Sequence, residues 1–431
     1  MRALYAAYTA LNSGIFLSGF PFFWLYSQLS GRYSRGLKER LGFVPDARVK
    51  DLTGFPRIWI HAVSLGEVKV AAPIIESLQG IKPDCSIILS TTTDHGFDLA
   101  MELFRKKIPV IYAPIDTIFS VREALSRVRP EALVFLETEI WPAWIVEAQR
   151  MGIKIALVNG RISVRSIGSY LKFRSFFREV LKRVNAFSMI LEEDGDRIRS
   201  MGAHPGKIKI NGNAKYDFLA KEADTATPGR MRESLNLEDS QPVFIAGSTR
   251  KGEESMILDV YEKILKEFPK TVLIIAPRHI ERTLEIVSMI ERHGLKYQLQ
   301  SELKNSGSKR TDPILVINTF GELFKLYSIG TIIFCGASLV PLGGQNPLEP
   351  AVWGKAVFYG PSMEDFQDAK AMLEEVGAGI SVAGPEMLAE RAIWFLHHPD
   401  VLETSGTRAR DAVMKNQNAA VKHARVIAGL V

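Results

Sequence analysis

Short apolar runs alternate with amphipathic stretches along most of the chain. The runs are four to six residues long, which is typical of strands buried on both faces of a parallel sheet. The stretches between them, for example 68–78, 143–151, 253–267 and 281–293, have the periodicity of helices. The pattern predicts an α/β fold with two doubly wound, Rossmann-like halves. The first series of runs lies at 57–61, 86–90, 132–136, 154–158 and 187–191, and the second at 242–246, 271–276, 314–317, 331–335 and 356–359.

The two series predict the domain organisation. A length of 431 residues suits two domains. Residues 218–241 are polar and weakly patterned, so we expect a linker region between a first domain at 32–217 and a second at 242–405. We expect residues 406–431 to form a C-terminal helix that crosses back onto the first domain. The cleft between two such halves, at the carboxyl ends of the strands, is the expected ligand site.

The N-terminal segment predicts a membrane anchor at residues 1–31. Residues 3–31 contain no Asp, Glu, Lys or Arg, and this length is sufficient for a helix across a bilayer. Gly14, Gly19 and Pro21 interrupt the run, so an anchor lying in the membrane surface is an equal alternative. Basic residues follow from Arg32 onward, which predicts a cytoplasmic location for the rest of the chain. A cleaved signal peptide is less favoured because only Arg2 precedes the run, and a buried core helix is the other alternative.

Charge and cysteine content narrow the chemistry. The net charge of +6 fits nucleic acid, an anionic membrane or an acidic substrate as partner. The only cysteines are Cys85 and Cys335, which makes a disulfide scaffold improbable. The eight histidines form no HxxxH or HxH pair, so we expect no zinc site.

One basic stretch favours lipid over nucleic acid. Arg174, Arg178 and Lys182 recur at a spacing of four and would share one helical face. We interpret the stretch as a surface for anionic headgroups or a phosphorylated lipid, with a solvated helix face as the alternative. No recognised nucleic-acid motif accompanies it. Its other basic residues are Arg161, Arg165, Lys172 and Arg183, and its aromatic residues are Tyr170, Phe173, Phe176 and Phe177.

Carboxylates follow two predicted strands of the first half. Glu67 comes after a small-residue turn beyond residues 57–61, where a carboxylate can act as a general base. The alternative is a glutamate that caps a helix. Glu137 and Glu139 follow residues 132–136 and precede Trp141 and Pro142. One of this pair can face the cleft, or both can be capping or solvated residues.

The second half has turn residues at four strand ends. Glycines there can let backbone N–H groups approach a phosphate, which Arg278 would neutralise. Glu349 can accept a hydrogen bond from a ribose hydroxyl. Together the four turns predict a nucleotide site. They begin at Gly247, Pro277, Phe320 and Gly343.

These residues together resemble the bacterial 3-deoxy-D-manno-octulosonic acid (Kdo) transferases of lipopolysaccharide synthesis. The resemblance extends from the N-terminal segment to the C-terminal helix. Gln345, Asn318 and Ala143 depart from the usual family residues. The matching motifs are Arg40-Leu41-Gly42, Ser64-Leu65-Gly66-Glu67, Glu137-Thr138-Glu139-Ile140-Trp141-Pro142, Gly212-Asn213-Ala214-Lys215-Tyr216-Asp217, Pro277-Arg278-His279 and the segment from Gly343 to Pro350.

The resemblance implies a GT-B fold, in which the two halves face a cleft. It implies inverting transfer of Kdo from CMP-Kdo to a lipid A precursor of the tetraacyldisaccharide 1,4'-bisphosphate type, with no metal and no cofactor besides this donor. Anionic inner-membrane lipids would be partners, nucleic acid would not, and the catalytic domains would lie on the cytoplasmic side of the inner membrane. Glu67 corresponds to the proton acceptor, and Glu137 and Lys215 to residues that stabilise the transition state. The implied CMP-binding residues are Pro277, Arg278, Phe320, Gly321, Glu322, Asn346, Pro347, Leu348 and Glu349.

Two other functions remain open. A GT-B enzyme that uses a different nucleotide sugar, such as a UDP-sugar, would share most of these features. A non-catalytic membrane-bound nucleotide sensor would bind CMP without releasing a product.

Overall fold

The protein is represented by a computed structural model, which describes residues 35–50, 52–104 and 107–431 and isolated positions between residues 8 and 22. The chain forms two compact units, here called unit 1 (residues 1–218 and 417–431) and unit 2 (219–416). The predicted anchor at 1–31 lies outside the described residues, apart from those isolated positions. Among the residues that are described, no helix has the length and apolar character needed to cross a membrane.

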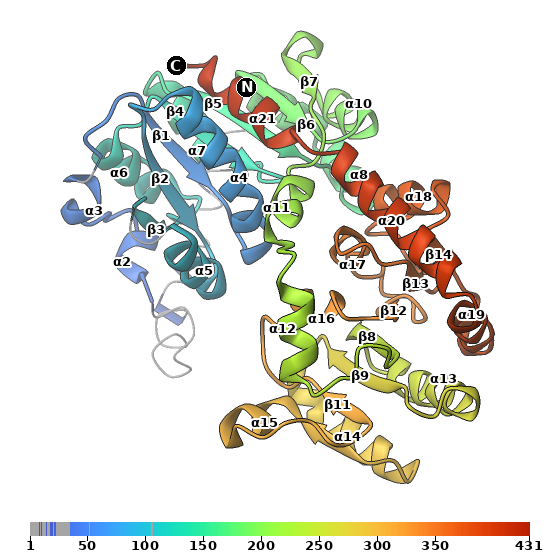
Figure 1. The fold of residues 1–431 in the computed structure, drawn as a ribbon. Helices are drawn as coiled ribbons and strands as arrows, with labels where there is room; N and C mark the ends of the chain where they lie inside the picture. Colours follow the sequence, from blue (N-terminus) through green and yellow to red (C-terminus); the bar gives the residue numbers. More distant parts are fainter. Residues whose placement is uncertain are drawn as a thin grey trace. The chain divides into compact units, whose positions relative to one another are not determined.

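Unit 1 is built on a seven-stranded, entirely parallel sheet with strand order β3-β2-β1-β4-β5-β6-β7 (Figure 1). Its strands are β1 (Arg57–His61), β2 (Ser86–Thr91), β3 (Val110–Tyr112), β4 (Ala132–Leu136), β5 (Lys154–Gly160), β6 (Ala186–Met189) and β7 (Ile208–Ile210). Its helices are α2 (Leu37–Arg40), α3 (Asp46–Lys50), α4 (Leu65–Ile81), α5 (Asp94–Phe104), α6 (Ile118–Val128), α7 (Pro142–Arg150), α8 (Val164–Lys172), α9 (Arg174–Leu181), α10 (Glu192–Met201), η1 (Pro205–Lys207) and α21 (Ala419–Ala428). Helix α11 (Lys215–Glu222) contains the boundary between the units.

The strands of this sheet are buried on both faces. In β1, Ile58 and Ile60 pack into one hydrophobic cluster, whereas Trp59 packs into another on the opposite face. In β4, Leu133 and Val134 divide between the same two clusters. Because alternate side chains of a strand point to opposite faces, helices must cover both sides, and this explains the continuous apolar runs in the sequence.

Unit 2 has the same design, with strand order β10-β11-β9-β8-β12-β13-β14, all parallel. Its strands are β8 (Val243–Thr249), β9 (Val272–Pro277), β10 (Tyr297–Leu299), β11 (Ile314–Val316), β12 (Ile332–Cys335), β13 (Val357–Tyr359) and β14 (Gly379–Ser381). Its helices are α12 (Thr227–Ser234), α13 (Glu253–Glu267), η2 (Ile280–Arg282), α14 (Thr283–Arg292), α15 (Gln300–Ser306), α16 (Leu323–Tyr327), α17 (Leu348–Val352), α18 (Gln367–Glu375), α19 (Pro385–His397) and α20 (Pro399–Lys415). Both units are therefore Rossmann-like, as the sequence predicts.

Two segments differ from the predicted elements. The expected linker region contains helix α12. Leu235, the residue after the last turn of α12, packs into a hydrophobic core of unit 2. The expected single C-terminal helix is two helices, α20 and α21, because Asn418 has a left-handed φ of 73° that no helix interior adopts. The break lets α20 stay in unit 2 while α21 packs against α4 in unit 1.

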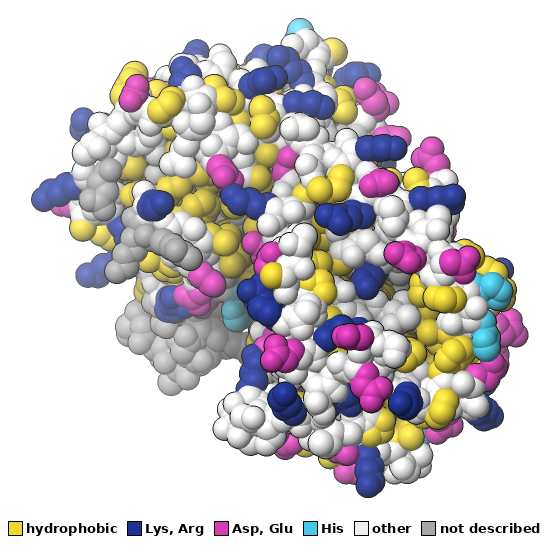
Figure 2. All heavy atoms as spheres, in the orientation of Figure 1, with side chains coloured by type: hydrophobic (Ala, Val, Ile, Leu, Met, Phe, Trp, Pro, Cys, Tyr) yellow, Lys and Arg dark blue, Asp and Glu magenta, His cyan; other side chains and the backbone are white. Residues whose placement is uncertain are grey.

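The surface carries charges of both signs. On the face drawn in Figure 2, dark blue, magenta and hydrophobic side chains alternate over short distances. Charges of both signs are therefore mixed on this face, and local clusters have to be identified from their residues.

Candidate active site

Glu67 lies in the first turn of α4, just beyond the carboxyl end of β1. Its Oε2 accepts a hydrogen bond of 2.8 Å from the backbone N–H of Val63, which lies one residue before the N-cap Ser64. The side chain is nevertheless buried, at 7% exposure. Burial, followed by the charges of Glu137 and Glu139, raises its pKa to about 8, although the Val63 hydrogen bond and Lys215 act in the opposite direction. Glu67 therefore fixes the turn before the helix and also holds a proton that can exchange near neutral pH.

Glu137 directly follows β4 and has an unusual backbone conformation. Its φ of 52° lies in the left-handed region, which costs a non-glycine residue roughly 1–2 kcal/mol. Its N–H donates to the carbonyl of Val158 on β5, at 3.2 Å. Its Oε1 lies 2.9 Å from Nζ of Lys215, and its side chain is 19% exposed. The interpretation of Glu137 as a solvated residue is therefore wrong.

Glu139 lies in the same cluster but has a different partner. Its carboxylate accepts a hydrogen bond from the indole N–H of Trp141. Burial and, to a smaller extent, the charge of Glu137 raise its pKa, while the Trp141 bond opposes the rise. This neighbour was seen in the sequence motif but was not predicted as a site residue. Glu139 raises the pKa of Glu67 because the folded loop after β4 places its charge near that side chain.

Lys215 completes the cluster from the first position of α11. The turn before it is fixed by Asn213, whose Oδ1 accepts from the Lys215 N–H at 3.0 Å, and by Asn159, whose Oδ1 accepts from the Ala214 N–H at 2.8 Å. The ammonium group is partly buried against Glu137. The structure thus brings together Glu67, Glu137 and Lys215. The first and last of these residues are 148 positions apart in the sequence.

This cluster has the chemistry of proton transfer. A carboxylate whose pKa lies near the working pH is an efficient general base or acid. A cation held beside it can stabilise negative charge on a substrate or transition state. Within the described residues, no group of three or more His, Cys, Asp or Glu side chains is arranged to hold a metal ion.

In unit 2, the predicted nucleotide-binding segments all follow strands of one parallel sheet and so lie at its carboxyl edge. Pro277 is the last residue of β9 and Arg278 follows it, and Phe320 to Glu322 follow its neighbour β11. Asn346 to Glu349 follow β12, and the Oδ1 of Asn346 accepts the N–H of Leu348 at 3.2 Å. The Arg278 side chain is exposed, while its N–H donates to the carbonyl of Thr249 at 3.0 Å.

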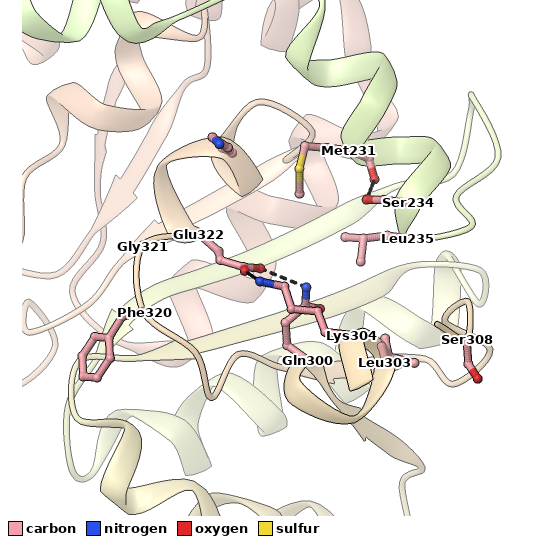
Figure 3. Close-up of a pocket in the computed structure, with 11 residues that line it drawn as sticks. Met231, Ser234, Leu235, Gln300, Leu303, Lys304, Ser308, Phe320, Gly321 and Glu322 are labelled. Atoms are coloured by element: carbon pink, nitrogen blue, oxygen red, sulfur yellow. Dashed lines mark hydrogen bonds and ion pairs between the residues drawn. The ribbon is translucent and has the colours of Figure 1, made fainter. Parts of the chain in front are cut away.

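A cavity of about 410 Å³ lies beside the Phe320–Glu322 turn, between α12 and α15 (Figure 3). Glu322 is directed toward Lys304, with which it forms an ion pair, and accepts a hydrogen bond of 2.9 Å from Nε2 of Gln300. Phe320 is 70% exposed and points away from these residues. The Oε1 of buried Gln300 has no hydrogen-bond partner among the described residues. The Glu322 side chain thus already has two partners within unit 2.

The turn that begins at Gly247 has one of its N–H groups, that of Arg250, bonded within the protein. The carboxylate of Glu253 is fully buried and accepts hydrogen bonds of 2.7–3.0 Å from four backbone N–H groups, those of Arg250, Ala337, Ser338 and Leu339. Gly247 serves packing instead, because a Cβ at this position would lie 2.0 Å from Oη of Tyr327. Of these four donors only the Arg250 N–H belongs to the turn that begins at Gly247, so Glu253 takes one of the N–H groups that the sequence suggested for a phosphate.

The basic aromatic stretch forms α8 and α9, and only part of it faces solvent. Arg178 and Lys182 are about half exposed, and Lys182 pairs with Glu179 at 2.7 Å. Phe173 is 66% exposed, but Tyr170 and Phe176 pack against a hydrophobic core of unit 1. The predicted aromatic surface is therefore reduced, because two of its four rings contribute to the core.

Comparisons with known proteins identify the family. Residues 35–218 match the family model described as 3-deoxy-D-manno-octulosonic-acid transferase (kdotransferase). The chain is 30% identical over 399 residues to the 3-deoxy-D-manno-octulosonic acid transferase of Haemophilus influenzae, and the match covers 92% of each chain. It is 37% identical over 348 residues to a bifunctional glycosyltransferase/methyltransferase of Fusobacterium nucleatum; this match covers 79% of the chain but only 53% of that protein, about half its length.

A solved structure shows the same fold. UDP-GlcNAc 2-epimerase from Neisseria meningitidis superimposes with a TM-score of 0.61 at 16% identity, covering 87% of this chain and 99% of that one. At this identity the likeness concerns the fold alone. The sequence comparisons identify the family: the chain belongs to the 3-deoxy-D-manno-octulosonic acid transferases, a family of glycosyltransferases.

Proposed function

We propose that this chain is an inverting glycosyltransferase that moves Kdo from CMP-Kdo to a lipid A precursor. The observation that carries the proposal is the charge cluster of unit 1, in which buried Glu67, with a pKa raised to about 8, lies near the 2.9 Å ion pair of Lys215 with Glu137. Family membership supports Kdo as the transferred sugar.

The proposed chemistry assigns one task to each group. The acceptor hydroxyl attacks the anomeric carbon of Kdo, and deprotonated Glu67 takes the hydroxyl proton as the new C–O bond forms. The bond between Kdo and the CMP phosphate breaks, and its electron pair leaves with the phosphate. A base whose pKa is near the reaction pH combines a useful deprotonated fraction with sufficient proton affinity. Lys215, held by Glu137, supplies a cation for the Kdo carboxylate or for charge that develops in the transition state.

Donor binding is assigned to unit 2. Exposed Arg278 is available for the CMP phosphate, to which an arginine can form charge-assisted hydrogen bonds. Exposed Phe320 offers an aromatic face near the cavity beside the Phe320–Glu322 turn. The free Oε1 of Gln300 can accept a hydrogen bond from a ligand there. The segment from Asn346 to Glu349 is the third part of the proposed CMP site.

Acceptor and membrane contacts are assigned to unit 1. A bisphosphorylated glycolipid is anionic, and the exposed Arg178 and Lys182 side chains of the α9 region, beside Phe173, have the matching chemistry. The proposal includes the N-terminal anchor at 1–31 and a location on the cytoplasmic side of the inner membrane. It also includes the GT-B arrangement, in which a donor held by one unit meets an acceptor held by the other.

A product assay tests the proposal. The purified protein is incubated with CMP-Kdo and a tetraacylated lipid A precursor, and the lipid is weighed by mass spectrometry. We expect a mass increase of one or more Kdo residues, and inhibition by CMP but not by UDP. Transfer from a UDP-sugar, with inhibition by UDP, would replace the donor assignment, and CMP binding without any product would instead support a nucleotide sensor.

A further inference from the structure

The turn that leads to Lys215 rests on a buried polar network. His423 of α21 is fully buried, with Nε2 3.0 Å from the carbonyl oxygen of Gly212 and Nδ1 2.7 Å from Oγ of Ser188 at the end of β6. Asn211 extends the network, since its Nδ2 lies 2.5 Å from the same Ser188 Oγ. Helix α21 packs against α4 and also touches β5 and β6 (Figure 1).

The direction of each hydrogen bond follows from the partners. A carbonyl oxygen can only accept, so Nε2 of His423 carries the hydrogen that is donated to Gly212. The Asn211 amide donates to Ser188, and the Ser188 hydroxyl then donates to the lone pair on Nδ1 of His423. Burial lowers the pKa of His423 to about 4, so the ring is neutral at pH 7 and this arrangement is its stable form.

A second contact fixes the other side of Lys215. The carboxylate of Asp217 accepts the backbone N–H groups of Asn418 at 2.7 Å and Ala420 at 3.1 Å, at the start of α21. Lys215 is thus bracketed by two attachments to one helix, at Gly212 on one side and at Asp217 on the other. Both attachments join residues of unit 1 that are about 200 positions apart in the chain.

We propose that His423 and Asp217 are positioning residues, through which the C-terminal helix α21 holds the Lys215 ammonium group against Glu137. The inference rests on the proposed role of Lys215 in Kdo transfer. Loss of the Gly212 contact would free the turn before Lys215 while leaving the side chains of Glu67, Glu137 and Lys215 chemically intact. Displacement of a positioned group by about 1 Å can reduce the rate roughly 100-fold.

The test compares four full-length variants in the Kdo transfer assay. His423→Leu removes every hydrogen bond of the ring, including the one that Nδ1 accepts from the Asn159 N–H at 3.4 Å, whereas His423→Gln can restore a donor to the Gly212 carbonyl. Ile427→Ala is the matched control, because Ile427 is a fully buried residue of α21 that belongs to the apolar core and not to the network. Lys215→Met reports the loss of the ammonium group itself. For each variant, kcat, KM for the donor, the pH profile and the melting temperature are measured.

We expect His423→Leu to lower kcat roughly 100-fold with a nearly unchanged donor KM, and His423→Gln to recover much of the loss. The ascending limb of the pH profile should move to higher pH in His423→Leu, as in Lys215→Met, because Lys215 acts against the charges of Glu137 and Glu139 on Glu67. Ile427→Ala should lower the melting temperature without either effect.

The inference is overturned if His423→Leu keeps the wild-type kcat and pH profile while Lys215→Met is impaired. It is also overturned if Ile427→Ala loses kcat to the same extent, since α21 would then act only through general stability. A Lys215→Met variant with wild-type kcat would instead refute the proposed function of Lys215. Asp217→Asn provides a second variant if His423→Leu does not fold, and it should also lower kcat.

Discussion

The charge neighbours of Glu67 should control the pH at which the enzyme becomes active. Glu137 raises the pKa of Glu67, and Lys215, 2.9 Å from Glu137, lowers it. Glu137→Gln removes a negative charge but keeps an oxygen that can accept from Lys215. It should therefore lower the pKa of Glu67, whereas Lys215→Met should raise it. One structure thus predicts shifts of opposite sign for two partners in the same ion pair.

The size of the shifts follows from the electrostatics of a partly buried site. With an effective dielectric constant of about 20, two unit charges interact by about 1.4 kcal/mol even at a separation of about 12 Å. This free energy corresponds to about one pH unit. In the wild type we expect kcat/KM to rise tenfold per pH unit up to an inflection near the Glu67 pKa of about 8. The inflection should move by about one pH unit, downward for Glu137→Gln and upward for Lys215→Met.

The assay is the initial rate of Kdo transfer, measured from pH 5 to pH 10 at low donor concentration, so that kcat/KM reports the free enzyme. Circular dichroism at the extremes of this range excludes unfolding as the cause of a lost rate. Shifts of the same sign in both variants, or an inflection that does not move, would refute the electrostatic coupling of these three residues.

Three further outcomes follow from the structure. Arg278→Ala should weaken CMP binding by roughly ten- to a hundredfold through loss of a charge-assisted hydrogen bond, and unchanged affinity in calorimetry would remove Arg278 from the donor site. Reversal of Arg174, Arg178 and Lys182 to Glu should raise the acceptor KM and reduce vesicle binding with the fold intact; normal values would leave this helix face as solvated surface. Glu67→Gln should be more stable than the wild type at pH 9. The raised pKa of Glu67 stabilises the folded wild type fully below about pH 4.5, and this stabilisation is lost as the pH rises through about 8. An equal melting-temperature difference at pH 5 and pH 9 would contradict this.

The sequence predicted the buried strands better than the exposed edges. All ten apolar runs correspond to strands, because residues covered on both faces must be continuously apolar. The four strands that were missed, β3, β7, β10 and β14, are the edge strands of the two sheets and have three residues each. So short a run, paired on one side only, carries little periodic signal.

The sequence predicted which residues belong to the candidate site, but not which residues they contact. Strand ends are visible in the sequence, so Glu67 and Glu137 could be selected as candidates. The pairing of Glu137 with Lys215, and the network beneath Lys215 that includes His423, depend on contacts between distant segments. A lone histidine in the C-terminal helix was the only available signal for the latter.

The predicted basic aromatic surface was less accurate, because the sequence did not show which residues of a helix face the core and which face solvent. Spacing indicated that basic and aromatic residues of α8 and α9 share a region, but it could not tell which rings the core would bury. Similarly, a turn with glycine indicated free N–H groups after β8, whereas the buried carboxylate of Glu253 satisfies four donors there and beyond β12. Such internal satisfaction of polar groups follows from the cost of leaving them unpaired, but its partners appear only in the folded chain.

The most direct test of Glu67 as the general base is the transfer rate of Glu67→Gln, with Glu137→Gln as its comparison. The glutamine keeps the size of the side chain and an oxygen that can accept from Val63, but it cannot take a proton. We expect kcat to fall by roughly 10²–10⁴-fold, with CMP affinity unchanged because unit 2 is assigned to the donor. If Glu67→Gln retains most of its kcat while Glu137→Gln is inactive, Glu67 is not the base and the roles of the two carboxylates are reversed.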